Sequence, residues 1–243
     1  MLPTGNLFLD SLSLPLRTSI MSASRPCELE LKTILVRPGK APTNLVFLTS
    51  GMASLVITVL DGGASEVGMM GREGFTGAST LIGPHVDHPE CIMQIPGRGF
   101  QVPRLFLHTL FCNTPEFQGK VLEVVQRQLN ISSQLLACNL RHEAEARFSR
   151  WLLTASDLID SPTLVMTQAF LSEMLGTQRT TISAIVQTLR ARGLITVSRG
   201  TVRILDTPGL KEAACECYEI CRRSLHHEAL PVVTPRWGTS QLA

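Results

Sequence analysis

Five arginines in a stretch without acids form the group of residues with the clearest chemical meaning in this chain. From Met174 to Leu205 there is no aspartate or glutamate, whereas the flanking sequence contains both. The arginines of this stretch are Arg179, Arg190, Arg192, Arg199 and Arg203. Spaced guanidinium groups without competing acids suit a polyanion, because they neutralise backbone phosphates. The stretch therefore predicts contact with nucleic acid.

The first of these arginines opens a predicted amphipathic helix. Apolar residues recur at the i, i+3, i+4 and i+7 positions of one buried helical face, namely Ile182, Ile185, Val186 and Leu189. The other side carries small or hydrogen-bonding residues that fit a major groove: Arg179, Thr180, Ser183, Ala184 and Gln187. Thr177 is expected to cap the N-terminus of the helix through its hydroxyl. The exposed backbone amides of the first helical turn favour a phosphate, and Gln178 is a further candidate for DNA contact.

A shorter helix precedes it and buries Leu171, Met174 and Leu175. Ser172 is small where two crossing helices approach closely, and Gly176 suits a turn with positive φ. This order predicts a helix-turn-helix that binds DNA. The alternative is an ordinary helical hairpin whose arginines only solvate its outer face.

Two short strands are predicted after the second helix, which ends at Gly193. They span residues 194–197 and 202–205, and the tight turn 198–201 joins them. Such a ribbon would be the wing of a winged helix-turn-helix. Arg199 at its tip and Arg203 are candidates for phosphate or minor-groove contacts. The alternative for Arg199 is an exposed turn arginine without a partner.

Cysteines and histidines form two weaker patterns. The seven cysteines are scattered, as expected of reduced thiols. Cys215, Cys217 and Cys221 could belong to a metal or redox site near His226 and His227, or could be small buried hydrophobes of a last helix. We favour the second interpretation, because only two of the three share a helical face. The run 85–91 (two histidines and a cysteine) is expected to be a solvated loop.

Composition narrows the function classes. The chain has 243 residues and a net charge of +2, so any nucleic-acid surface must be local. Neither a membrane span nor a secretory signal is expected, which favours a cytoplasmic protein. We find no nucleophile elbow, no Walker lysine and no paired histidine and carboxylate. We therefore expect neither enzymatic activity nor a cofactor or metal.

The region before the helix-turn-helix predicts an α+β organisation. Residues 25–108 suggest an antiparallel β domain, a small barrel or sandwich, with strands at 29–36, 45–48, 54–60, 91–95 and 99–102. A long helix starts at Thr114-Pro115 and runs to about Leu140. Its candidate dimer contacts are Val121, Leu122, Val125, Leu129 and Leu136. The alternative is a helix that packs only on its own domain.

Further helices are expected at 143–159 and from Thr207 to about His226. These elements divide the chain into four parts. We expect a β domain at 1–112, a dimerisation helix at 113–140, a DNA-binding domain at 141–228 and a disordered tail at 229–243.

This order of parts resembles the Crp/Fnr family of bacterial transcription regulators. The resemblance covers about residues 6–225 and is most specific at 166–205, which contains LSEMLGTQRTTISAIVQTLRARGLI. It is weaker at 46–56 and at Glu73-Gly74-Phe75-Thr76-Gly77, which is similar to the segment leading into the family's phosphate-binding site. It implies a cyclic-nucleotide-binding-like β-roll, a homodimer on palindromic double-stranded DNA, and RNA polymerase as a further candidate partner. By the same resemblance the effector pocket would comprise Gly74, Phe75, Gly77, Ala78 and Ser79.

The departures from the family concern the effector. Cyclic-nucleotide binders of the family carry a glutamate where this chain has Ala78, and an Arg-Ser or Arg-Thr pair where it has residues 85–89. Without that arginine a buried phosphate loses its bidentate partner, so we expect no cyclic AMP binding. Only Cys27 lies in the first ninety residues, which excludes the family's N-terminal iron–sulfur centre.

The predicted recognition helix also differs in sequence from the recognition helices of individual family members. Many carry a glutamate at the position of Thr180 and an arginine at that of Ala184, so the target sequence cannot be transferred. The leading hypothesis is a DNA-binding transcription regulator with an unknown effector. The alternative is a small-molecule or thiol-redox sensing module with weak or vestigial DNA binding.

Overall fold

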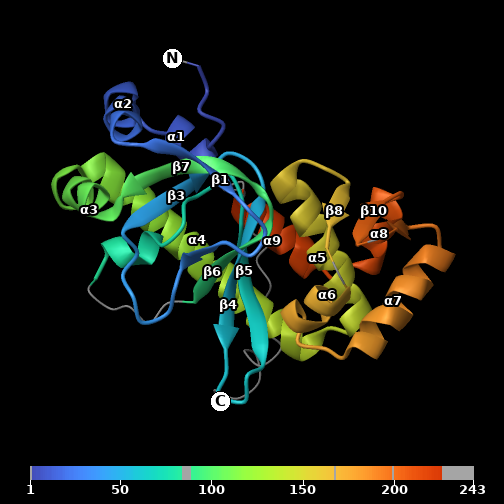
Figure 1. Ribbon diagram of the computed structural model, residues 1–243. Helices are drawn as coiled ribbons and strands as arrows, with labels where there is room; N and C mark the ends of the chain where they lie inside the picture. The colour runs from blue at the N-terminus through green and yellow to red at the C-terminus, as the bar shows by residue number, and fades with distance from the viewer. Residues whose placement is uncertain (1, 84–88, 167, 199, 226–243) are drawn as a thin grey trace, which may run out of the picture.

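The computed structural model describes residues 2–83, 89–166, 168–198 and 200–225. It has the predicted α+β architecture. A β-roll lies at one side, the long helix α4 (Pro115–Arg141) runs along it, and a smaller domain of helices and short strands lies at the other side (Figure 1). No helix among the described residues is long and apolar enough to cross a membrane.

Two antiparallel sheets build the β-roll. One has the order β1-β7-β3, and the other has the order β2-β6-β4-β5. Their strands are β1 (Arg25–Leu29), β2 (Ile34–Val36), β3 (Asn44–Leu48), β4 (Met52–Thr58), β5 (Ala64–Met70), β6 (Glu90–Ile95) and β7 (Gly97–Pro103). The antiparallel prediction is confirmed. The single strand predicted at 29–36 is wrong, because the chain turns at Lys32, whose φ is +66°.

Several elements of this half were not predicted. They are β5, the helices α1 (Leu7–Asp10), α2 (Leu14–Ser22) and α3 (Arg104–Asn113), and the 3-10 turn η1 (Ala78–Leu81). The β5 sequence contains Gly68 and Glu66, which lower the strand signal. Its pairing with β4 across a hairpin supplies the hydrogen bonds that the sequence pattern did not reveal.

Aromatic rings fill the core between the N-terminal helices and the sheet. Phe47 and Phe75 stack with 4.7 Å between ring centroids, and Phe8 lies 4.9 Å from Phe75. Phe117 of α4 is also fully buried in this cluster. Since Phe8, Phe75 and Phe117 come from different parts of the chain, their burial fixes the N-terminal helices and α4 against the β-roll.

The helix α4 begins as predicted, with Pro115 at its first position. Thr114 occupies the cap position but makes no side-chain cap hydrogen bond. Buried residues of α4 include Val121, Val124 and Leu135, and the first two pack in the core of the β-roll.

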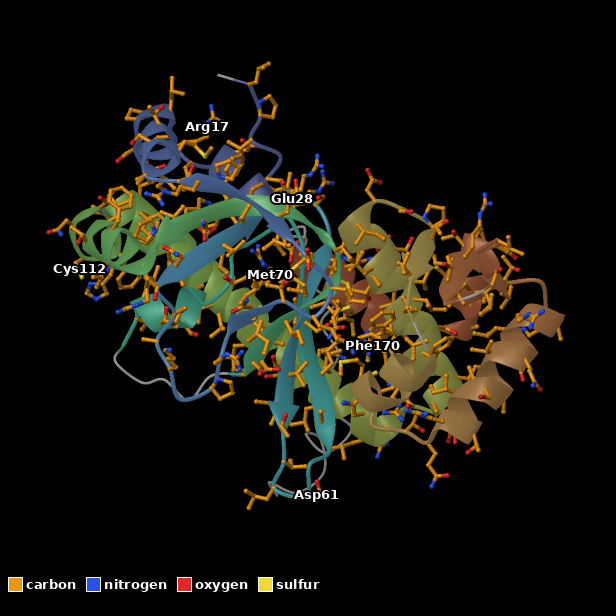
Figure 2. All side chains as sticks on the ribbon, viewed as in Figure 1. Arg17, Glu28, Asp61, Met70, Cys112 and Phe170 are labelled. Atoms are coloured by element: carbon orange, nitrogen blue, oxygen red, sulfur yellow. The ribbon has the colours of Figure 1, made fainter. Side chains whose placement is uncertain are left out.

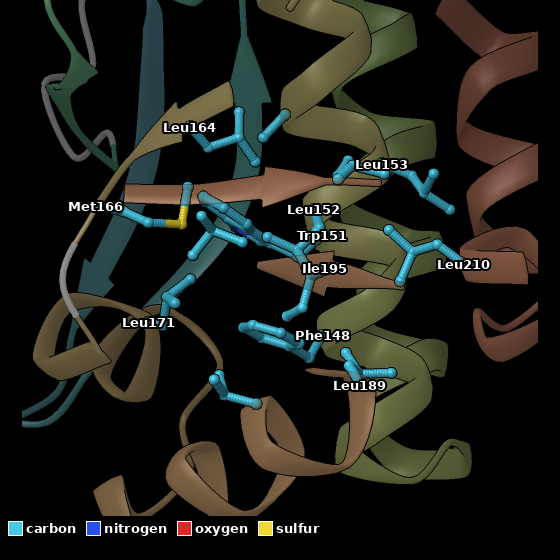
Figure 3. Packing of buried hydrophobic residues seen from close by; sticks show 14 of the residues in the cluster. Phe148, Trp151, Leu152, Leu153, Leu164, Met166, Leu171, Leu189, Ile195 and Leu210 are labelled. Carbon is cyan, nitrogen blue, oxygen red and sulfur yellow. The ribbon is translucent and has the colours of Figure 1, made fainter. Parts of the chain in front are cut away.

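The second domain is built on α5 (Ala144–Ile159), which the sequence predicted with nearly these bounds. The remaining elements are β8 (Thr163–Val165), α6 (Gln168–Met174), α7 (Arg179–Ala191), β9 (Ile195–Ser198), β10 (Thr201–Ile204), α8 (Thr207–Ala213) and α9 (Cys217–Leu225). Figure 3 shows how α5 and these elements enclose one apolar core, with Phe148, Trp151 and Leu152 between Leu171, Leu189 and Ile195. The prediction of one helix from Thr207 to about His226 is wrong, because the helix is interrupted between α8 and α9.

A buried polar contact joins the two halves. Trp151 Nε1 of α5 donates a hydrogen bond of 2.9 Å to Glu66 Oε1 of β5, and Ser54 donates to the other carboxylate oxygen. Phe170, which lies between the β-roll and the second domain in Figure 2, packs edge-on against Trp151 at 6.1 Å. Burial raises the pKa of Glu66 from 4.5 to about 7, against the lowering effect of Ser54, Arg150 and Trp151.

This carboxyl should make stability depend on pH. Between about pH 4.5 and 7 the folded chain retains a proton that the unfolded chain has released, so stability falls as the pH rises, by up to roughly 3 kcal/mol. Glu66→Gln should remove this decrease, since an amide does not ionise and still accepts from Trp151. Urea unfolding at pH 5 and pH 8 measures the difference. Glu28→Gln, at an exposed carboxyl paired with Arg98, should behave like the parent chain, and an unchanged pH slope in Glu66→Gln would contradict the assignment.

Candidate nucleic-acid interface

The helices α6 and α7 form the predicted helix-turn-helix. All four apolar residues predicted for the inner face of α7 are buried, with Ile182 and Leu189 fully so. Leu171, Met174, Leu175 and Ser172 are buried on the α6 side as well. Gly176 has φ +57° in the turn, a conformation that costs an L residue energy. The predicted inner faces are therefore confirmed.

The outer face of α7 is open to solvent. Arg179, Thr180, Ala184 and Gln187 are exposed there, and Gln178 is exposed just before the helix. Ser183 is half-buried and donates a hydrogen bond of 3.0 Å to the carbonyl of Arg179. The exposed residues lie on one side because their spacing follows the helical repeat. This side offers a guanidinium, hydroxyls and an amide to a ligand.

The start of α7 differs from the prediction. Gln178, not Thr177, occupies the cap position, and no side chain caps the helix. The backbone N–H of Thr177 instead donates to the carbonyl of Ser172, which closes the turn between the helices. Thr177 is therefore a turn residue. The first-turn amides of α7 have no side-chain cap among the described residues, and such amides favour an anion.

The five arginines of the acid-free stretch have different environments. Arg179, Arg190 and Arg203 are exposed. Arg192 forms an ion pair of 2.9 Å with Glu145 of α5, so it ties the end of α7 to its own domain. Arg199, the predicted wing-tip contact, lies outside the described residues.

The wing is a three-stranded sheet with the order β8-β10-β9. The strands β9 and β10 are antiparallel, with Ser198 opposite Thr201, as predicted to within a residue. Gly193 and Gly200 have φ of +73° and +79° at the two turns. The strand β8, which was not predicted, covers β10 on the side away from β9, so Arg203 lies on a central strand.

A cleft of 700 Å³ separates the start of the helix-turn-helix from the hairpin between β4 and β5. Gly62, Gly63 and Ala64 of the hairpin face Ser172, Gly176, Thr177, Gln178 and Thr181 across it. Asp61 lies at the far tip of this hairpin in Figure 2. The turn of the helix-turn-helix thus lies next to a part of the β-roll.

The residues of the predicted effector pocket are buried or half-buried in this structure. Phe75 is fully buried, Ala78 is 1% exposed, and both fill the apolar core of the β-roll. Gly77 adopts φ +69° and leads into η1, while Ser79 is half-buried there. The backbone of Gly74 accepts from Asn6, whose side chain is buried. A cavity of 410 Å³ lies elsewhere on the roll and is lined partly by Cys27, Arg37, Lys40 and Gln101.

The candidate dimer residues of α4 divide into two groups. Val121 is fully buried in its own core, and Val125 is half-buried against it, so these two belong to the intramolecular face. Leu122, Leu129 and Leu136 are 46%, 65% and 64% exposed. They recur at heptad spacing and form, with Leu140, an exposed apolar ridge along α4.

A cysteine–histidine cluster lies where α4 meets the connection between α8 and α9. The potential ligand atoms of Cys138, His142, Cys215 and Cys217 all lie within 4.8 Å of one another. A hydrogen bond from Cys215 lowers the pKa of Cys138 to about 5, while the same contact raises that of Cys215. The sequence interpretation considered only the C-terminal cysteines and missed Cys138 and His142. Cys221 lies outside this group.

The comparisons with known proteins agree with this geometry. Residues 146–213 match the family model of the Crp-like helix-turn-helix domain. The match covers α5, α6, α7 and the wing, and it ends in α8. A search of curated proteins found no match.

Solved structures show the same fold over most of the chain. A transcriptional regulator of the Crp/Fnr family from Eubacterium rectale has a TM-score of 0.68 at 16% identity, over 87% of this chain and 99% of that one. A Crp/Fnr-family regulator from Thermus thermophilus has a TM-score of 0.65 at 19% identity, over 78% and 98% of the two chains. The c-di-GMP-responsive global regulator CLP from Xanthomonas campestris has a TM-score of 0.65 at 18% identity, over 80% and 100%. The chain therefore has the Crp/Fnr-like fold: N-terminal sheets, a long helix and a C-terminal helix-turn-helix domain.

The turn glycine offers a test of the helix-turn-helix geometry. Gly176→Ala should lower the free energy of unfolding by roughly 1 kcal/mol, because φ +57° strains an L residue. Gly119→Ala should raise it by about 0.5–1 kcal/mol, since a Cβ there would meet nothing within 4 Å among the described residues of a regular helix. Urea unfolding of the two variants measures both effects. Equal shifts of the same sign would contradict this description of the turn.

Proposed function

We propose that the protein is a transcription regulator that binds a palindromic DNA site as a homodimer. The observation that carries this proposal is the open, acid-free face of α7. Its inner face is buried in the second domain, so the helix is held rigidly while its outer face remains available. A helix held in this way can enter a major groove, where side chains meet base edges.

The roles of individual residues follow from their positions. Arg179 and Thr180, on the first turn of α7, would meet bases or phosphates, with Ser183 and Gln187 one and two turns further on. Gln178 and Thr177 would contact a phosphate near the helix N-terminus. Arg203 of β10, together with Arg199, would reach the backbone from the wing. Arg192 would act indirectly, through its ion pair with Glu145.

The second half of the proposal is the dimer. Leu122, Leu129 and Leu136 leave large apolar side chains in solvent along α4. Pairing of two such ridges would remove them from water, and burial of a leucine stabilises by about 1.5–3 kcal/mol. Two copies related by a twofold axis would place their α7 helices about one DNA turn apart, roughly 34–36 Å.

The effector of this regulator is expected to differ from cyclic AMP. Ala78 places a methyl group in the apolar core, where cyclic-nucleotide binders of the family have a carboxylate for the ribose. RNA polymerase is a further candidate partner, which rests on the resemblance to the family alone.

Selection of bound fragments from a random DNA pool should yield a palindrome with half-sites one helical turn apart. On the selected fragment, Arg179→Ala should weaken binding roughly fivefold to 150-fold, because one good base contact is worth about 1–3 kcal/mol. Electrophoretic retardation at fixed salt measures the change. Arg98→Ala, which removes the same charge from an exposed ion pair on β7, should bind like the parent. Equal binding by all three proteins would refute the assignment of α7.

The dimer ridge has its own test. Leu129→Glu should convert the dimer to a monomer, because two carboxylates would face each other across the ridge. Sedimentation velocity measures the mass in solution. Leu105→Glu is the matched control, since Leu105 is also exposed, at 71%, but lies on α3. A parent chain that sediments as a monomer at all concentrations would contradict the dimer proposal.

A further inference from the structure

Four side chains of the metal-binding type converge at the junction of the two domains. Cys138 and His142 are four residues apart at the end of α4, so they lie on one side of the helix. Cys215 precedes α9 and Cys217 is its first residue. From these positions we propose that Cys138, His142, Cys215 and Cys217 bind one Zn²⁺ ion in a tetrahedral site.

The distances suit a single ion. Cys138 Sγ lies 3.5 Å from Cys215 Sγ, and Cys217 Sγ lies 3.7 Å from His142 Nδ1. With zinc–sulfur bonds of about 2.3 Å, the edges of a tetrahedral site are about 3.8 Å long. All four potential ligand atoms lie within 4.8 Å of one another. Only small side-chain movements would therefore bring the four atoms to equal distances from a central ion.

The groups around the four ligands also match a metal site. His142 turns Nδ1 toward Cys217, and its Nε2 lies 3.2 Å from Glu216 Oε1. A metal-bound histidine commonly donates its other ring N–H to a carboxylate, which orients the ring. Gln134 Nε2 donates a hydrogen bond of 3.0 Å to Cys217 Sγ. Such a donor stabilises negative charge on sulfur.

Charge provides an independent observation. Three thiolates, a neutral imidazole and a divalent ion carry a net charge of −1. Arg150 of α5 is 3% exposed, and its Nε and Nη1 have no hydrogen-bond partner among the described residues. Its guanidinium acts electrostatically on Cys138 and Cys221, and also on Glu66, whose burial opposes ionisation. A buried cation beside a cysteine cluster is costly unless an anionic group compensates it, and an anionic zinc–thiolate centre would do so.

The donor set favours zinc over other metals. Three sulfurs and one imidazole are soft or borderline ligands, which calcium and magnesium do not prefer. The three cysteines are buried, with exposed fractions of 0%, 7% and 1%, and four protein ligands leave no open position. This is the pattern of a structural zinc site. An iron–sulfur cluster would need its ligands spread around several iron atoms.

The consequence of binding concerns the hinge between the domains. His142 is the C-cap residue of α4 and lies just before α5. Cys215 and Cys217 lie just before and at the start of α9. An ion bound here would cross-link the long helix to the C-terminal end of the second domain. It would thus fix the position of α9, which packs on both α4 and α5.

Metal binding by the full-length chain tests the proposal without DNA. The chain purified under reducing conditions should bind one equivalent of Zn²⁺, and the Co²⁺ form should show the intense visible absorption and thiolate charge transfer of a tetrahedral sulfur site. Cys138→Ser with Cys217→Ser should abolish both. Cys221→Ser, which removes another buried thiol of α9 outside the four ligands, should bind like the parent.

A milder variant keeps the test meaningful if the double variant does not fold. Gln134→Ala should lower Zn²⁺ affinity about tenfold to a hundredfold, as expected for a group that supports a ligand. Three results would overturn the proposal: less than stoichiometric Zn²⁺ in the parent chain, an octahedral Co²⁺ spectrum, or recovery of a Cys138–Cys215 disulfide in place of bound metal.

Discussion

The arrangement of this molecule depends on the burial of α5 between the β-roll and the rest of the second domain. Trp151 is the centre of that contact. Its indole is 1% exposed within the second core, and its N–H reaches Glu66 on β5. One side chain thus belongs to the apolar packing of one domain and to the hydrogen bonding of the other. A buried carboxylate is costly unless it is hydrogen-bonded, so the position of α5 on the sheet is specified closely. The position of α5 in turn determines the positions of α7 and the wing, which belong to the same apolar core.

The same packing determines which arginines are available to a ligand. The sequence assigns the five arginines of the acid-free stretch to a helix start, a helix end and a wing, but it does not show which of them are engaged by other side chains. In the folded chain Arg192 is engaged by Glu145, whereas Arg179 lies on the open face of α7. A basic surface therefore arises from placement, not from a high net charge, which is only +2. The cleft beside the β4–β5 hairpin brings the β-roll to the start of that face. The β4–β5 hairpin and the turn before α7 therefore line the same cleft.

The cysteines show how local patterns can mislead. Around Cys215 and Cys217 the sequence offers no complete ligand set, and we expected small buried hydrophobes there. The residues that complete the proposed site, Cys138 and His142, are more than seventy positions away. The α8–α9 break brings them together, because it lets α9 return along α4. A search for the C-x3-H spacing at a helix end, combined with the C-x-C pair, would have revealed the candidates.

The sequence by itself determined the elements whose burial follows a strong period. The inner face of α7, the glycine turns, α4 and α5 were all predicted within a few residues, because one-sided apolar spacing and glycine backbone preferences are local properties. The weak strand β5, the short N-terminal helices, β8 and the break before Cys217 were not predicted, since partners distant in the chain stabilise them. Only the tertiary structure decided which apolar side chains are buried: Val121 and Phe75 lie in the core, whereas Leu129 is exposed. Periodicity shows which side of an element is apolar, but only packing decides what that side meets.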